Sequence, residues 1–211
     1  MSLNYRPRMT LNEKIGFFFK SPAAVAEPGT MSSLLMLRRE VQFCLIGDLA
    51  EEDAVIDIAM AKGEYRLFAT LMVLAASVDL LAKFYAGSDD VRNVGARIKG
   101  FAARYMFGGA KDPDRSALAF YTGLRNPLLH SFTLYDRKVE IWFVNRQPTF
   151  DIFENGEKPD HFLISVEGIY QAFVRGIRLY YAELITRSDL RHKFEAMYER
   201  YGTTGFGVMP E

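Results

Sequence analysis

The sequence predicts a mainly α-helical domain with one small β-hairpin inserted after the helix that ends near residue 129. Apolar residues recur at helical spacing through most of the chain, and Gly, Pro or Ser punctuate the segments between them. A short stretch near residue 140 is instead aromatic and β-branched, which is typical of strands. With 211 residues, of which 49% are hydrophobic and 25% charged, the chain suits one domain with a sizeable core.

Pro, Gly and helix-capping residues divide the chain into three parts. We expect a loosely organised N-terminal arm at 1–29, a single helical domain at 30–201 and a flexible glycine-rich tail at 202–211. The helices of the domain begin after Ser, Thr or Asp in most cases, and several end before Gly. They are expected at about 30–50, 54–61, 64–86, 90–107, 113–129, 165–186 and 188–201.

The helix at 64–86 has the clearest pattern. Its apolar residues follow a 4-3-4-3 rhythm that marks a core-facing stripe: Leu67, Leu71, Leu74, Val78 and Leu81. The run from Leu67 to Ala82 is too short to span a bilayer comfortably, and Ser77 and Asp79 interrupt it. We therefore expect a buried core helix, with no membrane contact. Asp79 needs a cationic partner there, either Arg125 or an arginine of the next helix.

The helix at 90–107 is basic, and no acid occurs between Arg92 and Lys111. Such a face could track the phosphate backbone of RNA, or it could simply be a solvated helix face. The residues that would contact nucleic acid are Arg92, Arg97, Lys99 and Arg104.

The hairpin region covers about 131–164. Its strands are expected at 131–135 and 139–144, joined by a tight turn at 136–138. Residues 145–160 are expected to form a loop, and 161–164 a third strand.

Charge and cysteine content narrow the classes of function. The 26 basic and 26 acidic residues balance, so no global charge favours nucleic acid or an anionic membrane. The single cysteine, Cys44, excludes an intrachain disulfide, and a reducing, cytoplasmic setting is the simplest expectation. His161 and His192 lack partners at metal-ligand spacing, so we expect neither a metal nor another cofactor.

The most suggestive chemistry lies at the end of the helix at 113–129. Arg125 and His130 would diverge by roughly 140° on a straight helix, since each residue turns it by about 100°. Pro127 presses on the carbonyl of Gly123, so we expect the helix to kink or end there and the two side chains to share a cleft. A histidine at a helix end suits general acid–base chemistry, and an arginine can hold a phosphate by two hydrogen bonds. The plainer alternative is a helix-capping histidine beside a surface ion pair.

The segment Arg125-Asn126-Pro127-Leu128-Leu129-His130 resembles the R-polar-x3-H signature of the HEPN superfamily, whose members are small helical bundles. The preceding acid-bearing helix and basic helix are also similar in order and spacing to a HEPN core, over roughly residues 30–200. Pro127 is unusual inside the motif and departs from the family pattern.

The resemblance implies a metal-independent endoribonuclease of a toxin or defence type, acting as a homodimer in which two motifs line one cleft. His130 would act on the RNA 2′-hydroxyl or on the leaving 5′-oxygen. Arg125 would stabilise the charge on the phosphate with support from Asn126, and Asp79 would hold Arg125 in place. The expected partners are a second copy of the chain, RNA, and an antitoxin or other protein.

Two other classes of function stay open at this point. Some HEPN proteins have lost activity and serve as binding or scaffold modules, and the neutral net charge favours that class. The chain could also be an unrelated helical domain in which the Arg–His turn only caps a helix.

Overall fold

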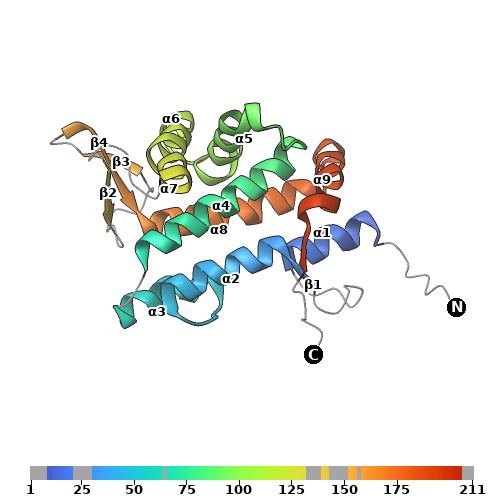
Figure 1. Cartoon of the computed structure of the whole chain (residues 1–211), viewed down its shortest axis with the longest axis horizontal. Coiled ribbons are helices and arrows are strands. Elements are labelled where there is room, and N and C mark those ends of the chain that lie inside the picture. The colour runs from blue at the N-terminus through green and yellow to red at the C-terminus, as the bar shows by residue number, and fades with distance from the viewer. Residues whose placement is uncertain are drawn as a thin grey trace, which may run out of the picture.

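The fold was analysed in a computed structural model, which describes residues 9–20, 30–63, 66–131, 139–142, 152–155 and 158–205. The described part is mainly α-helical, as predicted. Its longest helices are α4 (Leu67–Ala86) and α8 (Val166–Leu184), which pack on each other through the middle of the molecule (Figure 1). Helix α2 (Ser33–Ile46) and helix α3 (Val55–Lys62) lie on one side of this pair. Helices α5 (Val94–Phe101), α6 (Pro113–Ala119) and α7 (Asn126–Ser131) lie on the other.

Helix α4 is the core helix that its apolar rhythm predicts. Leu71, Leu74, Val78 and Leu81 are fully buried, and α2, α5, α8 and α9 (Ser188–Tyr201) all pack against it. Its length and apolarity alone would allow it to cross a membrane. The surrounding helices of the same chain account for those apolar residues, so we assign it to the interior of the bundle.

The N-terminal arm is more ordered than predicted. Residues Leu11–Lys20 form helix α1, because Ile15, Phe17, Phe18 and Phe19 all find buried positions. The Phe18 ring lies 4.4 Å from the Phe84 ring and 5.4 Å from the Phe194 ring, centroid to centroid. Aromatic packing therefore fixes α1 between α4 and α9.

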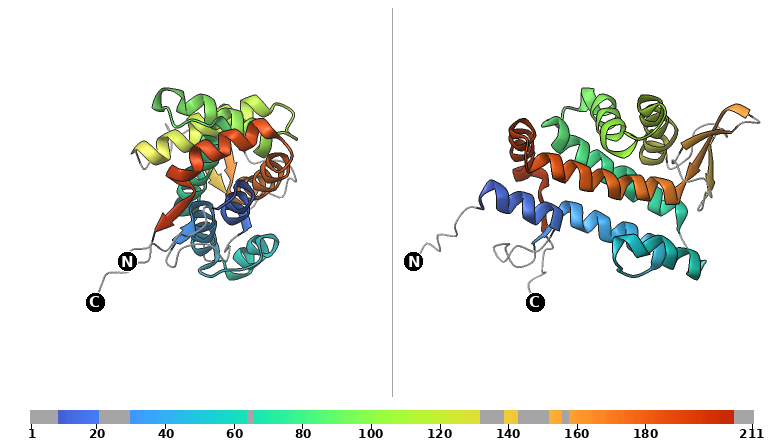
Figure 2. Two further views of the ribbon diagram at one scale, coloured as in Figure 1. Left: turned by 90° about the vertical axis from the view of Figure 1, so that its right-hand side faces the viewer. Right: turned by 180° about the vertical axis from the view of Figure 1, so that it is seen from behind.

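Two small sheets lie at opposite ends of α8 (Figure 2). Strand β1 (Thr30–Ser32) pairs antiparallel with β5 (Thr203–Gly205), so part of the predicted flexible tail is an ordered strand. The other sheet has the order β2-β4-β3, with β2 (Val139–Trp142) parallel to β4 (Lys158–Ser165) and β3 (Ile152–Asn155) antiparallel to it.

This second sheet corrects the predicted loop and supports the third strand. The loop expected at 145–160 contains β3, and the described hairpin is β3–β4. The sequence does contain a strand and turn pattern here, namely Ile152 and Phe153 followed by Asn155-Gly156. The many polar residues around it led to the prediction of a loop. The strand expected at 131–135 lies outside the described residues, except for Ser131, which ends α7.

In the part of the chain that the structure describes, two helices contain π-helical segments, in which backbone N–H groups bond five residues back. The segment η3 (Ala102–Met106) continues α5, and Phe107 N–H donates to the Ala102 carbonyl. The segment η4 (Phe120–Arg125) joins α6 to α7, and Asn126 N–H donates to the Tyr121 carbonyl. The helix therefore continues through Pro127, and the predicted kink takes the form of a widened turn just before the proline.

Candidate functional site

The widened turn η4 brings Arg125 and His130 together. Arg125 Nη1 lies 3.4 Å from His130 Nε2 and 3.4 Å from the Asn126 side-chain oxygen. Because a guanidinium has only donors, the first contact is a hydrogen bond only when Nε2 of a neutral imidazole accepts. His130 and Asn126 are exposed, whereas Arg125 is buried. The pair thus has an accessible histidine backed by a shielded cation.

Asp79 holds the other side of Arg125 from within α4. Its Oδ2 atom lies 3.5 Å from Arg125 Nη2, and its Oδ1 atom lies 3.3 Å from Arg97 Nη2. Both cationic partners considered for Asp79 are therefore present at once. Lys83, one helical turn further along α4, adds a third cation 3.8 Å from Oδ2. The cluster therefore links α4, α5 and η4 at one point.

Two members of this cluster were not predicted from the sequence. Lys83 follows Asp79 at a spacing of four residues, which places the two on neighbouring turns of one helix face. Tyr121 precedes Arg125 by the same spacing, and its ring centroid lies 5.9 Å from the Arg125 guanidinium carbon. This distance suits a cation–π contact. Helical spacing was the signal that could have found both residues.

The predicted nucleic-acid face is only partly exposed. Arg97 is buried with its guanidinium against Asp79, so it does not lie on the exposed face of the helix. Arg104 donates two hydrogen bonds of 2.9 Å to the Glu183 carboxylate. Arg92 pairs with Asp90 but stays 86% exposed, and Lys99 is half-buried. Acidic residues of neighbouring segments therefore neutralise much of the positive charge of this helix, which has no acidic residue of its own.

The Arg104–Glu183 pair also changes the chemistry of its neighbours. Burial would raise the pKa of Glu183, but hydrogen bonds from Arg104 and Tyr105 outweigh it and hold the pKa below its usual range. Burial, reinforced by the nearby Glu183 carboxylate, raises the pKa of Tyr105. Glu183 therefore stays ionised and Tyr105 stays a donor near neutral pH, which makes this cluster a structural tie between η3 and α8.

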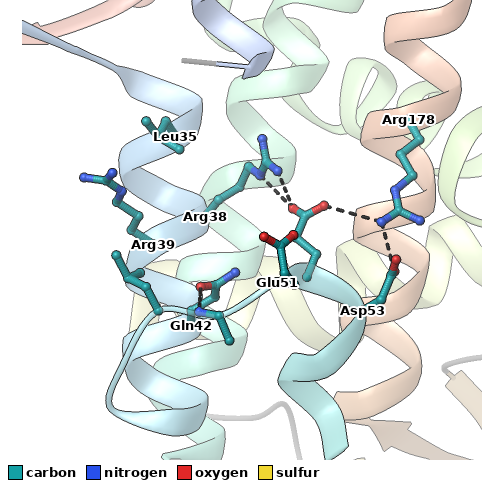
Figure 3. A pocket seen from close by; sticks show the side chains of 10 residues that line it. Leu35, Arg38, Arg39, Gln42, Glu51, Asp53 and Arg178 are labelled. Carbon is teal, nitrogen blue, oxygen red and sulfur yellow. Dashed lines mark hydrogen bonds and ion pairs between the residues drawn. The ribbon is translucent and has the colours of Figure 1, made fainter. Parts of the chain in front are cut away.

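A second charged cluster surrounds a hollow of about 290 Å³ between α2, the short helix η1 (Glu52–Ala54) and α8 (Figure 3). Arg38 lies 2.6 Å from the Glu52 carboxylate, and Arg178 lies 2.9 Å from Asp53 and 3.7 Å from Glu52. Most of the charges that line the hollow therefore neutralise one another. We assign this cluster to holding η1 between the two helices.

The described residues contain no group of three or more His, Cys, Asp or Glu side chains placed to hold a metal ion. No protein-family model, curated protein or solved structure matches this chain. The function is therefore inferred from the Asp79–Arg125–His130 geometry.

Proposed function

We propose that the protein is a HEPN-like endoribonuclease that cleaves RNA without a metal ion, through Arg125 and His130. The observation that carries the proposal is the 3.4 Å contact between Arg125 Nη1 and His130 Nε2. This contact supports the proposal because one phosphodiester could reach both the imidazole and the guanidinium. Asn126 stands beside them on the exposed face.

In the proposed reaction, Arg125 moves from His130 Nε2 to the phosphate, so that the Nε2 lone pair can accept the proton of the RNA 2′-hydroxyl. The 2′-oxygen then attacks the adjacent phosphorus. The bond from phosphorus to the 5′-oxygen then breaks, and a protonated group or water supplies a proton to that oxygen. Arg125 donates hydrogen bonds to the phosphoryl oxygens as negative charge grows on them. Asp79 positions Arg125 from the side opposite His130.

The proposal extends to the assembly. A homodimer would bring two Arg125–His130 pairs to one cleft, in a cytoplasmic setting with an antitoxin or other protein that controls the activity. The mass of the purified protein, measured by light scattering after size-exclusion chromatography, tests the dimer. A monomer at concentrations that support cleavage would contradict it.

The cleavage test uses purified protein, a mixture of structured and unstructured RNAs, and excess chelator. Wild type is expected to cleave, and His130→Ala is expected to lose about 100-fold or more in rate, since general acid–base catalysis contributes about 10²–10⁴. His192→Ala is the matched control, because His192 is also exposed but lies on α9. Equal cleavage by wild type and His130→Ala would sink the mechanism.

A second candidate is a binding module without catalysis. The observation that favours it is the neutralised basic helix, in which Arg92, Arg97 and Arg104 all contact acids. Such a surface attracts a polyanion less than the sequence predicts. Failure of the wild type to cleave any RNA, with or without added Mg²⁺, would favour this candidate.

A further inference from the structure

Asp79 contacts more cations than it can neutralise. Arg97 lies 3.3 Å from Oδ1, while Arg125 and Lys83 lie 3.5 Å and 3.8 Å from Oδ2. One carboxylate thus contacts three positive charges, and the nearby Asp90 carboxylate offsets part of the excess at Arg97. In a partly buried cluster this excess favours an anion that approaches from outside.

Arg97 is the fixed member of the cluster. Its Nη1 donates a 2.8 Å hydrogen bond to the Asp90 backbone carbonyl, and its side chain is only 5% exposed. Because the backbone carbonyl anchors the guanidinium, Arg97 keeps its place beside Asp79 Oδ1. Arg97 thus contacts that oxygen, and Arg125 contacts the other one.

Arg125 is held loosely by comparison. Its contacts with Asp79, Asn126 and His130 are 3.5, 3.4 and 3.4 Å, and none is as short as the 2.8 Å bond that anchors Arg97 to the Asp90 carbonyl. The Nε atoms of both arginines are buried without a hydrogen-bond partner. Charge-assisted hydrogen bonds usually measure about 2.7–2.9 Å. Breaking several long contacts costs an arginine less free energy than breaking a bidentate pair with a carboxylate.

We infer that Arg97 is a positioning residue, which keeps Arg125 available to an oxyanion by occupying one oxygen of Asp79. Without Arg97, Asp79 would be free to turn and bind Arg125 through both oxygens, and the pair would compete with a phosphate. The inference rests on the proposed function for the identity of the ligand, a phosphodiester. Arg97 itself does not touch that ligand.

The first test is phosphate binding, which requires no catalysis. Inorganic phosphate is titrated into the full chain at constant ionic strength, and the ring resonances of His130 are followed by NMR. Wild type is expected to give a saturable shift, and Arg97→Met is expected to weaken the affinity about tenfold, the scale of one charged hydrogen bond. Arg97→Lys restores a cation beside Oδ1 and is expected to bind within about threefold of wild type.

Two control variants separate positioning from a simple loss of charge. Lys83→Met removes one charge near the same carboxylate but leaves Oδ1 occupied, and Arg187→Met removes one charge at the α8–α9 turn. Both are expected to bind phosphate several times more tightly than Arg97→Met. Equal losses in Arg97→Met and Lys83→Met, or no saturable shift in wild type, would overturn the inference.

The second test is the crystal structure of Arg97→Met, in which both Asp79 oxygens are expected to contact Arg125 at less than the present 3.5 Å. An unchanged single-oxygen contact in the folded variant would overturn the inference. Arg97→Gln, which keeps a polar donor for the Asp90 carbonyl, replaces Arg97→Met if that variant does not fold.

RNA cleavage distinguishes this inference from the proposed function. If the RNA stays intact but the phosphate affinities are as expected, the proposed nuclease activity is wrong. Arg97 then still organises an anion-binding site. If wild type cleaves RNA and Arg97→Met has an unchanged kcat/KM, the positioning role of Arg97 is wrong. The proposed nuclease activity then still stands.

Discussion

The hydroxyl of Ser32 donates a 2.6 Å hydrogen bond to the carbonyl of Phe18, fourteen residues earlier in the chain. The same oxygen accepts a hydrogen bond from Leu35 N–H at 3.2 Å and so caps the N-terminus of α2. Ser32 is 1% exposed, so water cannot replace either bond. One side chain therefore both starts α2 and attaches the end of α1 to it.

Replacing Ser32 with Ala is expected to lower the free energy of unfolding by about 2–3 kcal/mol, since it removes a helix cap and leaves a carbonyl unpaired. Ser165→Ala is the matched control. Ser165 is equally buried and caps α8 through Gly168 N–H. Its loss is expected to cost about 1 kcal/mol. Urea denaturation measures both, and equal losses would show that the Phe18 bond contributes nothing.

Gly87 ends α4 in the left-handed region, at φ +68°, and α9 approaches it closely. A Cβ atom there would lie 2.8 Å from Lys193 Cγ and 3.1 Å from its Cα. Gly47 has the same φ at the end of α2, but its Cβ would meet nothing within 4 Å. Gly47→Ala is expected to cost about 1–2 kcal/mol from backbone strain alone. Gly87→Ala is expected to cost about 1–3 kcal/mol more from overpacking, and equal midpoints in thermal unfolding would contradict the contact with α9.

Asp79→Asn is expected to destabilise the fold by roughly 3 kcal/mol, because Arg97 and Arg125 would keep buried charges without a carboxylate. Asp53→Asn removes an acid of an ion pair whose carboxylate side is 81% exposed. That control is expected to change stability by less than about 1 kcal/mol. Chemical denaturation of both variants provides the measurement. Similar small losses in the two would mean that solvent or neighbouring groups satisfy the Asp79 cluster.

Glu183 is expected to make stability fall on acidification. Its pKa in the folded protein is held below its ordinary value of 4.5, although burial acts in the opposite direction. The unfolded chain therefore takes up the proton first as the pH drops, so the stabilisation is complete above the ordinary pKa. It is lost as the pH falls through the lower folded pKa.

Stability measured at closely spaced pH values between about 6 and 3 tests this linkage. Glu183→Gln is expected to be less stable than wild type at pH 6, and the difference is expected to shrink toward pH 3. A constant difference across this range would exclude a contribution from the ionisation of Glu183.

Much of the helical framework could be predicted because the apolar spacing of α4 and the cap of α2 are local signals. Helix α1 was missed because its apolar residues cluster without a clear period and make sense only against Phe84 and Phe194. The parallel pairing of β2 with β4 was also missed, because its register depends on contacts between residues such as Val139 and Phe162. Sequence patterns identify elements better than they identify long-range partners.

The candidate site could also be predicted in part from local signals, whereas its long-range contacts could not. Pro127 indicated a disturbance of the helix, and the widened turn before it brings Arg125 and His130 together. The burial of Arg97 was not predicted, because the absence of acids from its helix suggested an exposed basic face. Arg97 lies three residues after Val94 and four before Phe101, and Phe101 is fully buried. Its place on an inward face was therefore readable from the sequence.

The pairing of β1 with β5 has a consequence for synthesis on the ribosome. Residues 30–32 find their partners only when residues 203–205 have emerged, and Phe18 must wait as long for Phe194. Contacts of such large sequence separation slow folding and leave apolar surface uncovered in the meantime. In the nascent chain, the aromatic face of α1 can thus meet Phe84 early but stays uncovered on its α9 side until Phe194 has emerged.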